Sequence, residues 1–187
     1  MSHYIPVFFL PVSDDELPVE LNHWYSVEEL LGEKWENREQ NGLRTSTSRN
    51  WWLQYATSLI SEQLKIDGLG FIQKEIACLD KEQIEAAINA IDKLLVLCKS
   101  GIPELPEEIE KEGVIRYLRY YYEGKEIKRY SVEQIEKAYA ESFASYEVED
   151  EDKDSLVIFF SFLKSLRACL QECLNKKKKL LYVQPQP

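Results

Sequence analysis

Apolar residues at helical spacing define three long segments of the sequence. In residues 81–99 they recur every three or four positions, after a capping box formed by Asp80 and Gln83. A second capping box, with Ser131 as its first residue, precedes a helix predicted to end at about Ser145. Residues 155–176 carry a broad apolar face, which predicts a third and long helix.

Three further segments have weaker helical patterns. Residues 27–39 follow another capping box that begins at Ser26, and residues 51–65 follow Asn50, a residue type that caps helices well. Residues 114–123 keep helical spacing in spite of their tyrosines. Together with the three stronger segments, these patterns predict five or six helices.

Strands are expected mainly at the two ends of the chain. Residues 3–12 are rich in β-branched and aromatic residues, and residues 180–183 have the composition of a buried strand. Residues 71–78 fit either a strand or a short helix. The polar segment 43–50 and the acidic segment 147–154 are expected to be loops.

The fold class follows from this inventory of elements. Two end strands cannot form a large sheet, so the simplest assembly pairs them with each other and packs the helices around them. We predict a mainly helical α+β fold, with five or six helices around a small sheet that pairs the N-terminal and C-terminal strands. At 187 residues, the whole chain from 1 to 187 is expected to form a single globular domain.

Charge and hydropathy narrow the classes of partner. The net charge is −10, which argues against broad, sequence-independent binding of nucleic acids because such binding neutralises phosphates. No apolar run approaches the roughly 20 residues that a membrane helix needs, and no signal peptide is evident. Four scattered cysteines are typical of a reduced compartment. We therefore expect a cytoplasmic protein that does not bind membranes.

Recognisable catalytic chemistry is absent from the sequence. It contains no phosphate-binding loop, dinucleotide fingerprint or nucleophile elbow, and its only histidines are His3 and His23. Cys169 and Cys173 stand four residues apart, so they could in principle be two metal ligands, but the favoured interpretation is that they are small apolar residues beside the buried stripe of a helix. We assign no catalytic residue, no metal site and no cofactor.

The segment 116–130 stands out because five basic residues and five tyrosines alternate there, against two acids. Arg and Tyr are enriched in protein interfaces, and the same pair can hold a phosphate or stack on a base. The alternative is that the tyrosines are core residues and the cations balance acidic loops nearby. The candidate binding residues from this segment are Arg116, Tyr117, Arg119, Tyr120, Tyr121 and Arg129.

A second candidate is the Ser/Thr-rich segment bracketed by Arg44 and Arg49. It ends in two tryptophans, of which Trp51 is the one expected to face away from the core, because adjacent residues of a helix lie about 100° apart. Such a segment could form the rim of a binding site. The alternative is that Trp51 only covers the adjacent loop.

These observations favour a small acidic, non-enzymatic protein-interaction module. Its partner would be another protein, and an antagonist of a basic partner is one specific form of this hypothesis. The alternative is an enzyme or small-ligand-binding protein with an Arg/Tyr-lined pocket for an anionic ligand. The sequence leaves the oligomeric state open.

Overall fold

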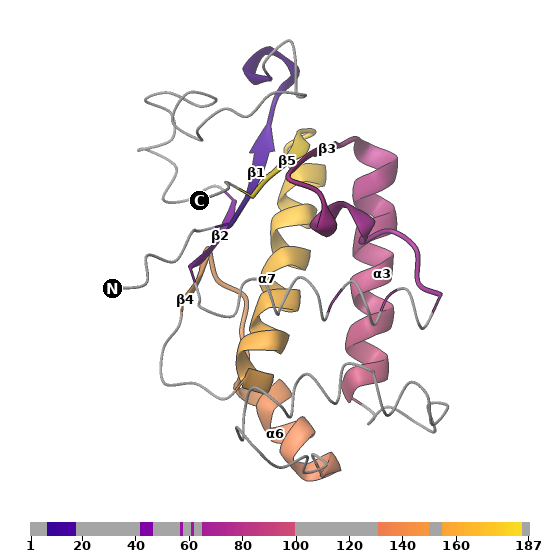
Figure 1. The fold of residues 1–187 in the computed structure, drawn as a ribbon, viewed down its shortest axis with the longest axis vertical. Coiled ribbons are helices and arrows are strands. Elements are labelled where there is room, and N and C mark those ends of the chain that lie inside the picture. Colours follow the sequence, from indigo (N-terminus) through magenta and orange to yellow (C-terminus); the bar gives the residue numbers. More distant parts are fainter. Residues whose placement is uncertain are drawn as a thin grey trace.

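The fold was analysed in a computed structural model that describes residues 7–17, 42–46, 57, 61, 65–99, 131–149 and 155–184. Within this part, a five-stranded sheet lies beside two long helices, and a third helix extends from one end of the molecule (Figure 1).

The sheet is mixed, with the strand order β3-β5-β1-β2-β4. The neighbouring pairs β3–β5, β5–β1 and β1–β2 are antiparallel, whereas β2 and β4 are parallel. The two strands from the chain ends therefore occupy the middle of the sheet, and β3 and β4 form its edges. The strands are β1 (Val7–Val12), β2 (Leu43–Ser46), β3 (Ile76–Leu79), β4 (Glu147–Glu149) and β5 (Lys179–Val183).

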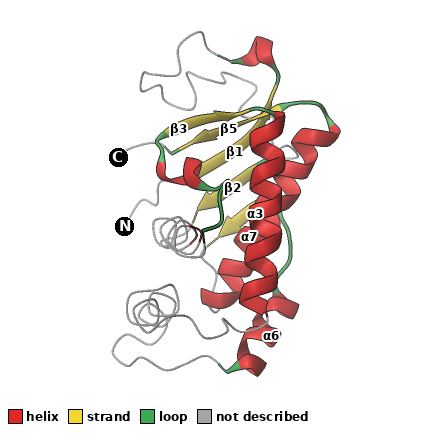
Figure 2. Ribbon diagram, turned by 90° about the vertical axis from the view of Figure 1, so that its right-hand side faces the viewer, coloured by secondary structure: helices red, strands yellow, loops and turns green. Residues whose placement is uncertain are grey.

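Helices α3 (Lys81–Lys99) and α7 (Ser155–Asn175) pack side by side against one face of the sheet, as Figure 2 shows. Helix α6 (Val132–Glu141) lies beyond the end of α7 and precedes β4. A short 3₁₀ helix, Asp14–Glu16, follows β1, and another, Gly70–Gln73, precedes β3.

Both faces of the central strands are buried. In β1, Phe9 belongs to the large cluster that includes the apolar sides of α3 and α7, whereas Phe8 belongs to a separate cluster on the opposite face. In β5, Tyr182 and Leu181 divide in the same way. This alternation is the two-residue period of a strand, so the near-continuous apolar runs at both chain ends are those of strands covered on two sides.

Tyr182 joins the sheet to the segment before β3. Its ring is 5.1 Å from that of Phe9 and 5.6 Å from that of Phe71, measured between centroids. Its hydroxyl donates a hydrogen bond to the carbonyl of Ile72 at 2.8 Å. Burial raises the pKa of Tyr182 well above its usual value, so this side chain stays neutral and structural.

Several sequence predictions are confirmed. The strands at the two chain ends form and pair, with Phe9 opposite Tyr182 in an antiparallel register. The three strong helical patterns correspond to α3, α6 and α7, and the capping boxes beginning at Asp80 and Ser131 are both formed. The sequence of residues 71–78 is compatible with either a strand or a short helix, and the structure divides them between a 3₁₀ helix and β3.

The predicted fold class is wrong. The described residues contain three α-helices and a five-stranded mixed sheet, and α3 and α7 lie on one face of that sheet rather than around a small one. The error came from two segments expected to be loops, 43–50 and 147–154, which supply β2 and β4. Both strands are short and largely polar, so neither has the apolar run that predicts a buried strand.

Other predictions fall outside the described residues. They are the helices at 27–39 and 114–123 and most of the one at 51–65, of which Thr57 and Ser61 are described and are helical. Within the described part of the chain, no helix combines the length and apolar character needed to cross a membrane.

Candidate protein-interaction surface

The connector between α6 and β4, residues 142–146, displays two aromatic side chains to solvent. Phe143 is 58% exposed and Tyr146 is 56% exposed. Exposed aromatic side chains are typical anchors of protein interfaces, because they bury a large area with little loss of conformational entropy. The connector is therefore the candidate interaction surface among the described residues.

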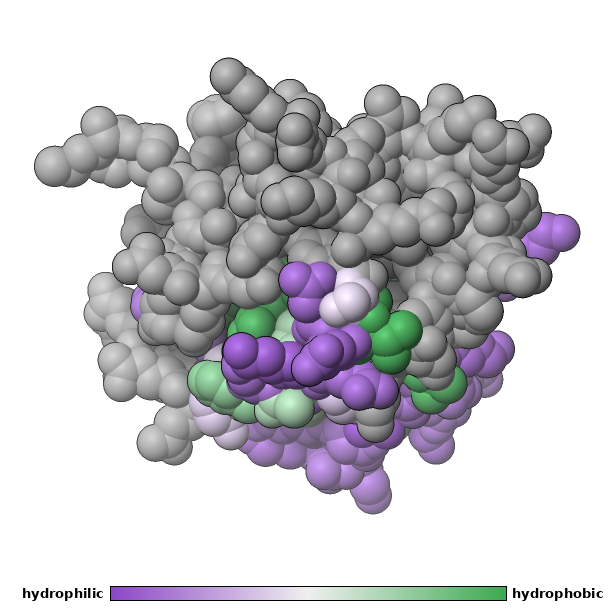
Figure 3. Space-filling view, turned by 90° about the horizontal axis from the view of Figure 1, so that it is seen from below, coloured by the Kyte–Doolittle hydropathy of each residue, from purple (hydrophilic) through white to green (hydrophobic). Residues whose placement is uncertain are grey.

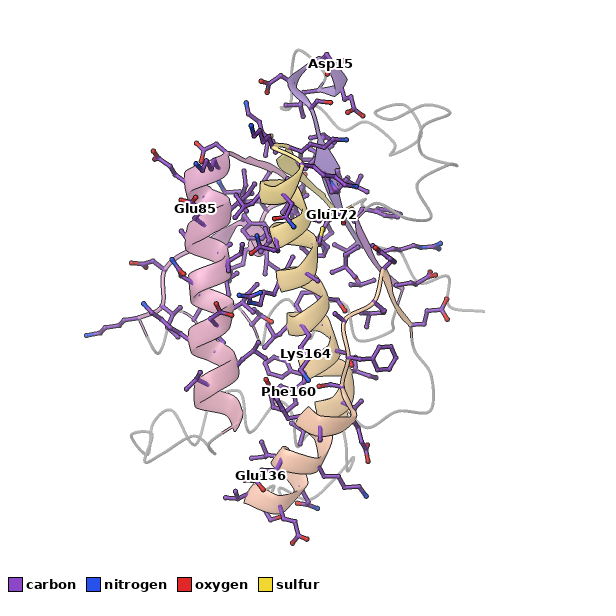
Figure 4. All side chains as sticks on the ribbon, turned by 180° about the vertical axis from the view of Figure 1, so that it is seen from behind. Asp15, Glu85, Glu136, Phe160, Lys164 and Glu172 are labelled. Carbon is purple, nitrogen blue, oxygen red and sulfur yellow. The ribbon has the colours of Figure 1, made fainter. Side chains whose placement is uncertain are left out.

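Lys164 of α7 fixes the start of the connector. Its ammonium group donates hydrogen bonds to the carbonyls of Tyr139 at 2.8 Å and Ser142 at 3.0 Å, and it lies 3.9 Å from the centre of the Tyr139 ring. Figure 4 shows Lys164 at the junction of α7 and α6, close to Phe160. The last carbonyls of a helix lack partners within the helix and carry partial negative charge, so a cation is well placed there.

Replacing this cation tests how the connector is anchored. We expect Lys164→Met to lower the free energy of unfolding by about 2 kcal/mol, because two carbonyls lose a charged donor. Chemical denaturation measures this loss, and hydrogen exchange should show faster opening of α6. Lys137→Met is the control, because Lys137 is exposed and its amine lies 3.9 Å from Glu141 in a surface pair of little energetic value. Equal losses in both variants would contradict this role of Lys164.

The rest of the connector is also fixed by hydrogen bonds. The Ser145 amide donates to the hydroxyl of Ser165 in α7 at 3.0 Å, and the Ser145 hydroxyl donates to the carbonyl of Glu147. The Arg44 amide of β2 donates to the carbonyl of Tyr146 at 2.9 Å. The backbone that carries Phe143 and Tyr146 is thus bonded to a helix and to the sheet, which lowers the entropy that binding would cost.

A hollow of about 610 Å³ lies between one side of the connector and the C-terminal half of α7. Its two cations already have anionic partners. Arg167 donates to both carboxylate oxygens of Asp92, and Lys176 lies 2.7 Å from a carboxylate oxygen of Glu172. This hollow therefore offers no uncompensated cation to an anionic ligand. It is lined by Gly42, Ala144, Ser145, Tyr146, Ser165, Arg167, Ala168, Cys169, Gln171, Glu172, Asn175 and Lys176.

A smaller hollow of about 230 Å³ lies on the other side of the connector, between β4 and the first half of α7. It combines apolar side chains with two glutamates and two serines. Its volume is below the roughly 300–1,000 Å³ of small-molecule sites, so it suits a single side chain. The lining residues are Phe143, Ser145, Glu147, Val148, Glu149, Ile158 and Ser161.

The surface around the connector is acidic. Residues 131–149 carry five glutamates and one lysine, and the acidic run 150–154 follows directly in the sequence. Figure 3 views the molecule from the end that holds α6, where hydrophilic and hydrophobic side chains of the described residues lie beside one another. Exposed aromatic side chains within an acidic surface fit a basic protein partner better than a nucleic acid or another acidic surface.

Of the sequence-predicted binding residues, the structure describes Arg44. It lies in β2 rather than in a loop, and its Nη1 is 3.5 Å from Oε1 of Glu147 on the neighbouring strand. Its Nε atom is buried and has no hydrogen-bond partner in the described part of the chain. The other candidates lie outside the described residues: Arg49, Trp51, Arg116, Tyr117, Arg119, Tyr120, Tyr121 and Arg129.

The cysteine pair of α7 belongs to the core. Cys169 and Cys173 are both buried, and the Cys169 thiol donates to the carbonyl of Phe9 at 3.4 Å. Its hydrogen bond with Cys173 and its burial raise the pKa of Cys169, which favours the neutral thiol over the thiolate that binds metals. Among the described residues, no group of three or more His, Cys, Asp and Glu side chains could hold a metal ion.

Sequence reasoning missed Phe143 and Tyr146. Both residues were assigned to the end of a helix or to the segment just after it, but α6 ends at Glu141 and Ser142 caps it. The available signal was an aromatic residue directly after a run of helix-forming residues, between two serines that favour caps and turns.

Comparison with known proteins adds no relative. The chain matches no protein-family model, and neither a curated protein nor a solved structure with significant similarity was found.

Proposed function

We propose that this chain is a non-enzymatic protein-interaction module whose connector, residues 142–146, binds a basic protein. The observation that supports this most directly is the pair of exposed aromatic side chains, Phe143 and Tyr146, on a backbone fixed by α7 and β2. An interface centred on rigid aromatic anchors needs little reorganisation on binding.

Charge supports the chemistry of the partner. The glutamates around the connector would attract a basic surface and accelerate association, and salt would weaken that attraction. An antagonist that masks the basic active surface of another protein is the specific form of this function that we favour. The alternative, an anionic-ligand pocket lined by Arg and Tyr of residues 116–130, stays a prediction because that segment lies outside the described residues.

Site-specific photo-crosslinking in native cells tests the proposal. We expect Phe143→p-benzoylphenylalanine to give an adduct with one protein of isoelectric point above 7, because the aromatic side chain at 143 would lie inside the interface. Raising the ionic strength of a cell extract from about 0.05 M to about 0.5 M should reduce the adduct several-fold, since the Debye length falls below about 5 Å.

The same crosslinker at Val132 is the matched control, since Val132 is a similarly exposed apolar residue (54%) near the start of α6. The adduct should be absent there. The same adducts from both positions, or none from position 143, would exclude the connector as the interaction site.

A further inference from the structure

We propose that the larger hollow, between the connector and the C-terminal half of α7, binds an uncharged nucleoside with its base against Tyr146. This inference goes beyond the proposed function and does not depend on it. The volume of the hollow, about 610 Å³, falls within the roughly 300–1,000 Å³ that small-molecule sites occupy.

The middle of this hollow is lined by small side chains. Ala144 comes from the connector, Gly42 directly precedes β2, and Ala168 and Cys169 are neighbours on α7. Ala168 is exposed, so the hollow is open to solvent there, whereas Cys169 is buried. A flat ring can therefore approach both the helix and the connector closely, because no large side chain from these four positions fills the space.

The charges of the lining favour an uncharged ligand. Arg167 donates to both carboxylate oxygens of Asp92, and Glu172 lies 2.7 Å from the ammonium of Lys176. Figure 4 shows Glu172 on the C-terminal half of α7. Each charged residue among the described lining residues thus belongs to an ion pair. An ionic ligand would have to displace one member of a pair and leave it without its partner, whereas an uncharged ligand would not.

The polar groups of the lining suit the base of a nucleoside. Tyr146, which is 56% exposed, is the aromatic residue among the described lining residues, and an aromatic ring stacks on any base. Nε2 of Gln171 donates to Oδ1 of Asn175 at 3.1 Å. This bond leaves the carbonyl oxygen of Gln171 and the amino group of Asn175 for a ligand, which places an acceptor and a donor on neighbouring side chains. The edges of bases present donors and acceptors side by side in the same way.

Both walls of the hollow are fixed before any ligand binds. The amide of Ser145 donates to the hydroxyl of Ser165 at 3.0 Å, which joins the connector to α7. The amide of Arg44 donates to the carbonyl of Tyr146 at 2.9 Å, which joins the connector to the sheet. The site is therefore largely preformed, as small-molecule sites usually are.

Two nucleosides and a nucleotide test this inference. Adenosine and guanosine are titrated separately into the full chain, and amide NMR follows the binding. We expect saturable shifts at Ala144, Tyr146, Ala168 and Gln171. Adenosine 5′-monophosphate carries the same base and an anionic phosphate, and we expect it to bind no more tightly than adenosine because the lining cations are already paired.

Substitutions at two positions separate the space from the ring. Ala168→Leu fills the hollow and should weaken binding of the nucleosides at least tenfold, while both residues favour a helix. Ala86→Leu is the matched control, because Ala86 is an exposed alanine of α3. Tyr146→Ala should weaken binding about tenfold through loss of stacking, whereas Tyr146→Phe keeps the ring and should stay within twofold.

Four outcomes would overturn the nucleoside site. They are the absence of saturable shifts with both nucleosides, at least tenfold tighter binding of the monophosphate than of adenosine, equal effects of Ala168→Leu and Ala86→Leu, and unchanged binding to Tyr146→Ala. Circular dichroism and thermal melting establish that each variant is folded. A specific crosslink from position 143 without nucleoside binding would leave the proposed function standing and this inference refuted.

Discussion

Deletion of residues 180–187 is expected to leave the chain unfolded or aggregated. The deletion removes all but the first residue of β5, which pairs with both β1 and β3 and so joins one edge strand to the middle of the sheet. The side chains of residues 180–183 are at most 1% exposed. Burial of each is worth roughly 1.5–3 kcal/mol, and their sum matches the roughly 5–15 kcal/mol by which domains are stable.

Circular dichroism and size-exclusion chromatography measure this effect, and hydrogen exchange of the intact protein complements them. The amides of residues 180–183 should exchange only on global unfolding, because they lie in the middle of the sheet. Lys179→Gln is the mild control at the start of β5, since it removes a surface ion pair with Asp14 at 2.8 Å. A truncated chain that melts like the intact one would show that β5 is dispensable.

The elements that the sequence predicted correctly are those with a clear local signal, such as a capping box, an apolar stripe or a continuous apolar run. α3 begins at a capping box and carries an apolar stripe, so the cap predicted its start and the spacing predicted its end at about Lys99. The strands β1 and β5 were found because they are buried on both faces, which makes their composition almost entirely apolar.

The strands that were missed depend on tertiary context. β2 has the sequence Leu-Arg-Thr-Ser, in which Leu43 and Thr45 are buried and Arg44 is partly exposed. Such a segment resembles a polar loop until β1 provides hydrogen-bond partners on one side and β4 on the other. β4 buries a single side chain, Val148, and its glutamates were assigned to an acidic loop. With these two strands missing, the sheet was predicted too small.

The candidate surface was beyond sequence reasoning for a related reason. Enrichment of arginine and tyrosine drew attention to residues 116–130, whereas the connector carries one Phe and one Tyr in an ordinary segment. What makes Phe143 and Tyr146 notable is their exposure on a backbone fixed by Lys164, Ser165 and Arg44, and no local pattern reveals contacts over such separations.

Gly42→Ala is expected to destabilise the protein by about 3 kcal/mol. Gly42 has a φ of +104°, a conformation that residues with a Cβ atom rarely adopt. A Cβ atom there would also lie 2.5 Å from the carbonyl oxygen of Phe9, so the backbone of β1 or β2 would have to move. Backbone strain of this kind costs roughly 1–3 kcal/mol, and the steric clash adds to it.

The matched control is Gly70→Ala, because a Cβ atom at Gly70 meets no heavy atom within 4 Å. We expect that variant to be neutral or slightly stabilised, since alanine restricts the unfolded chain more than glycine does. For a chain of this length, 3 kcal/mol corresponds to a fall in melting temperature of roughly 6–12 °C. Because Gly42 directly precedes β2, which aligns β4 through Arg44, the loss should also accelerate hydrogen exchange at Val148. Equal melting temperatures for the two alanine variants would contradict the close approach of Gly42 to the carbonyl oxygen of Phe9.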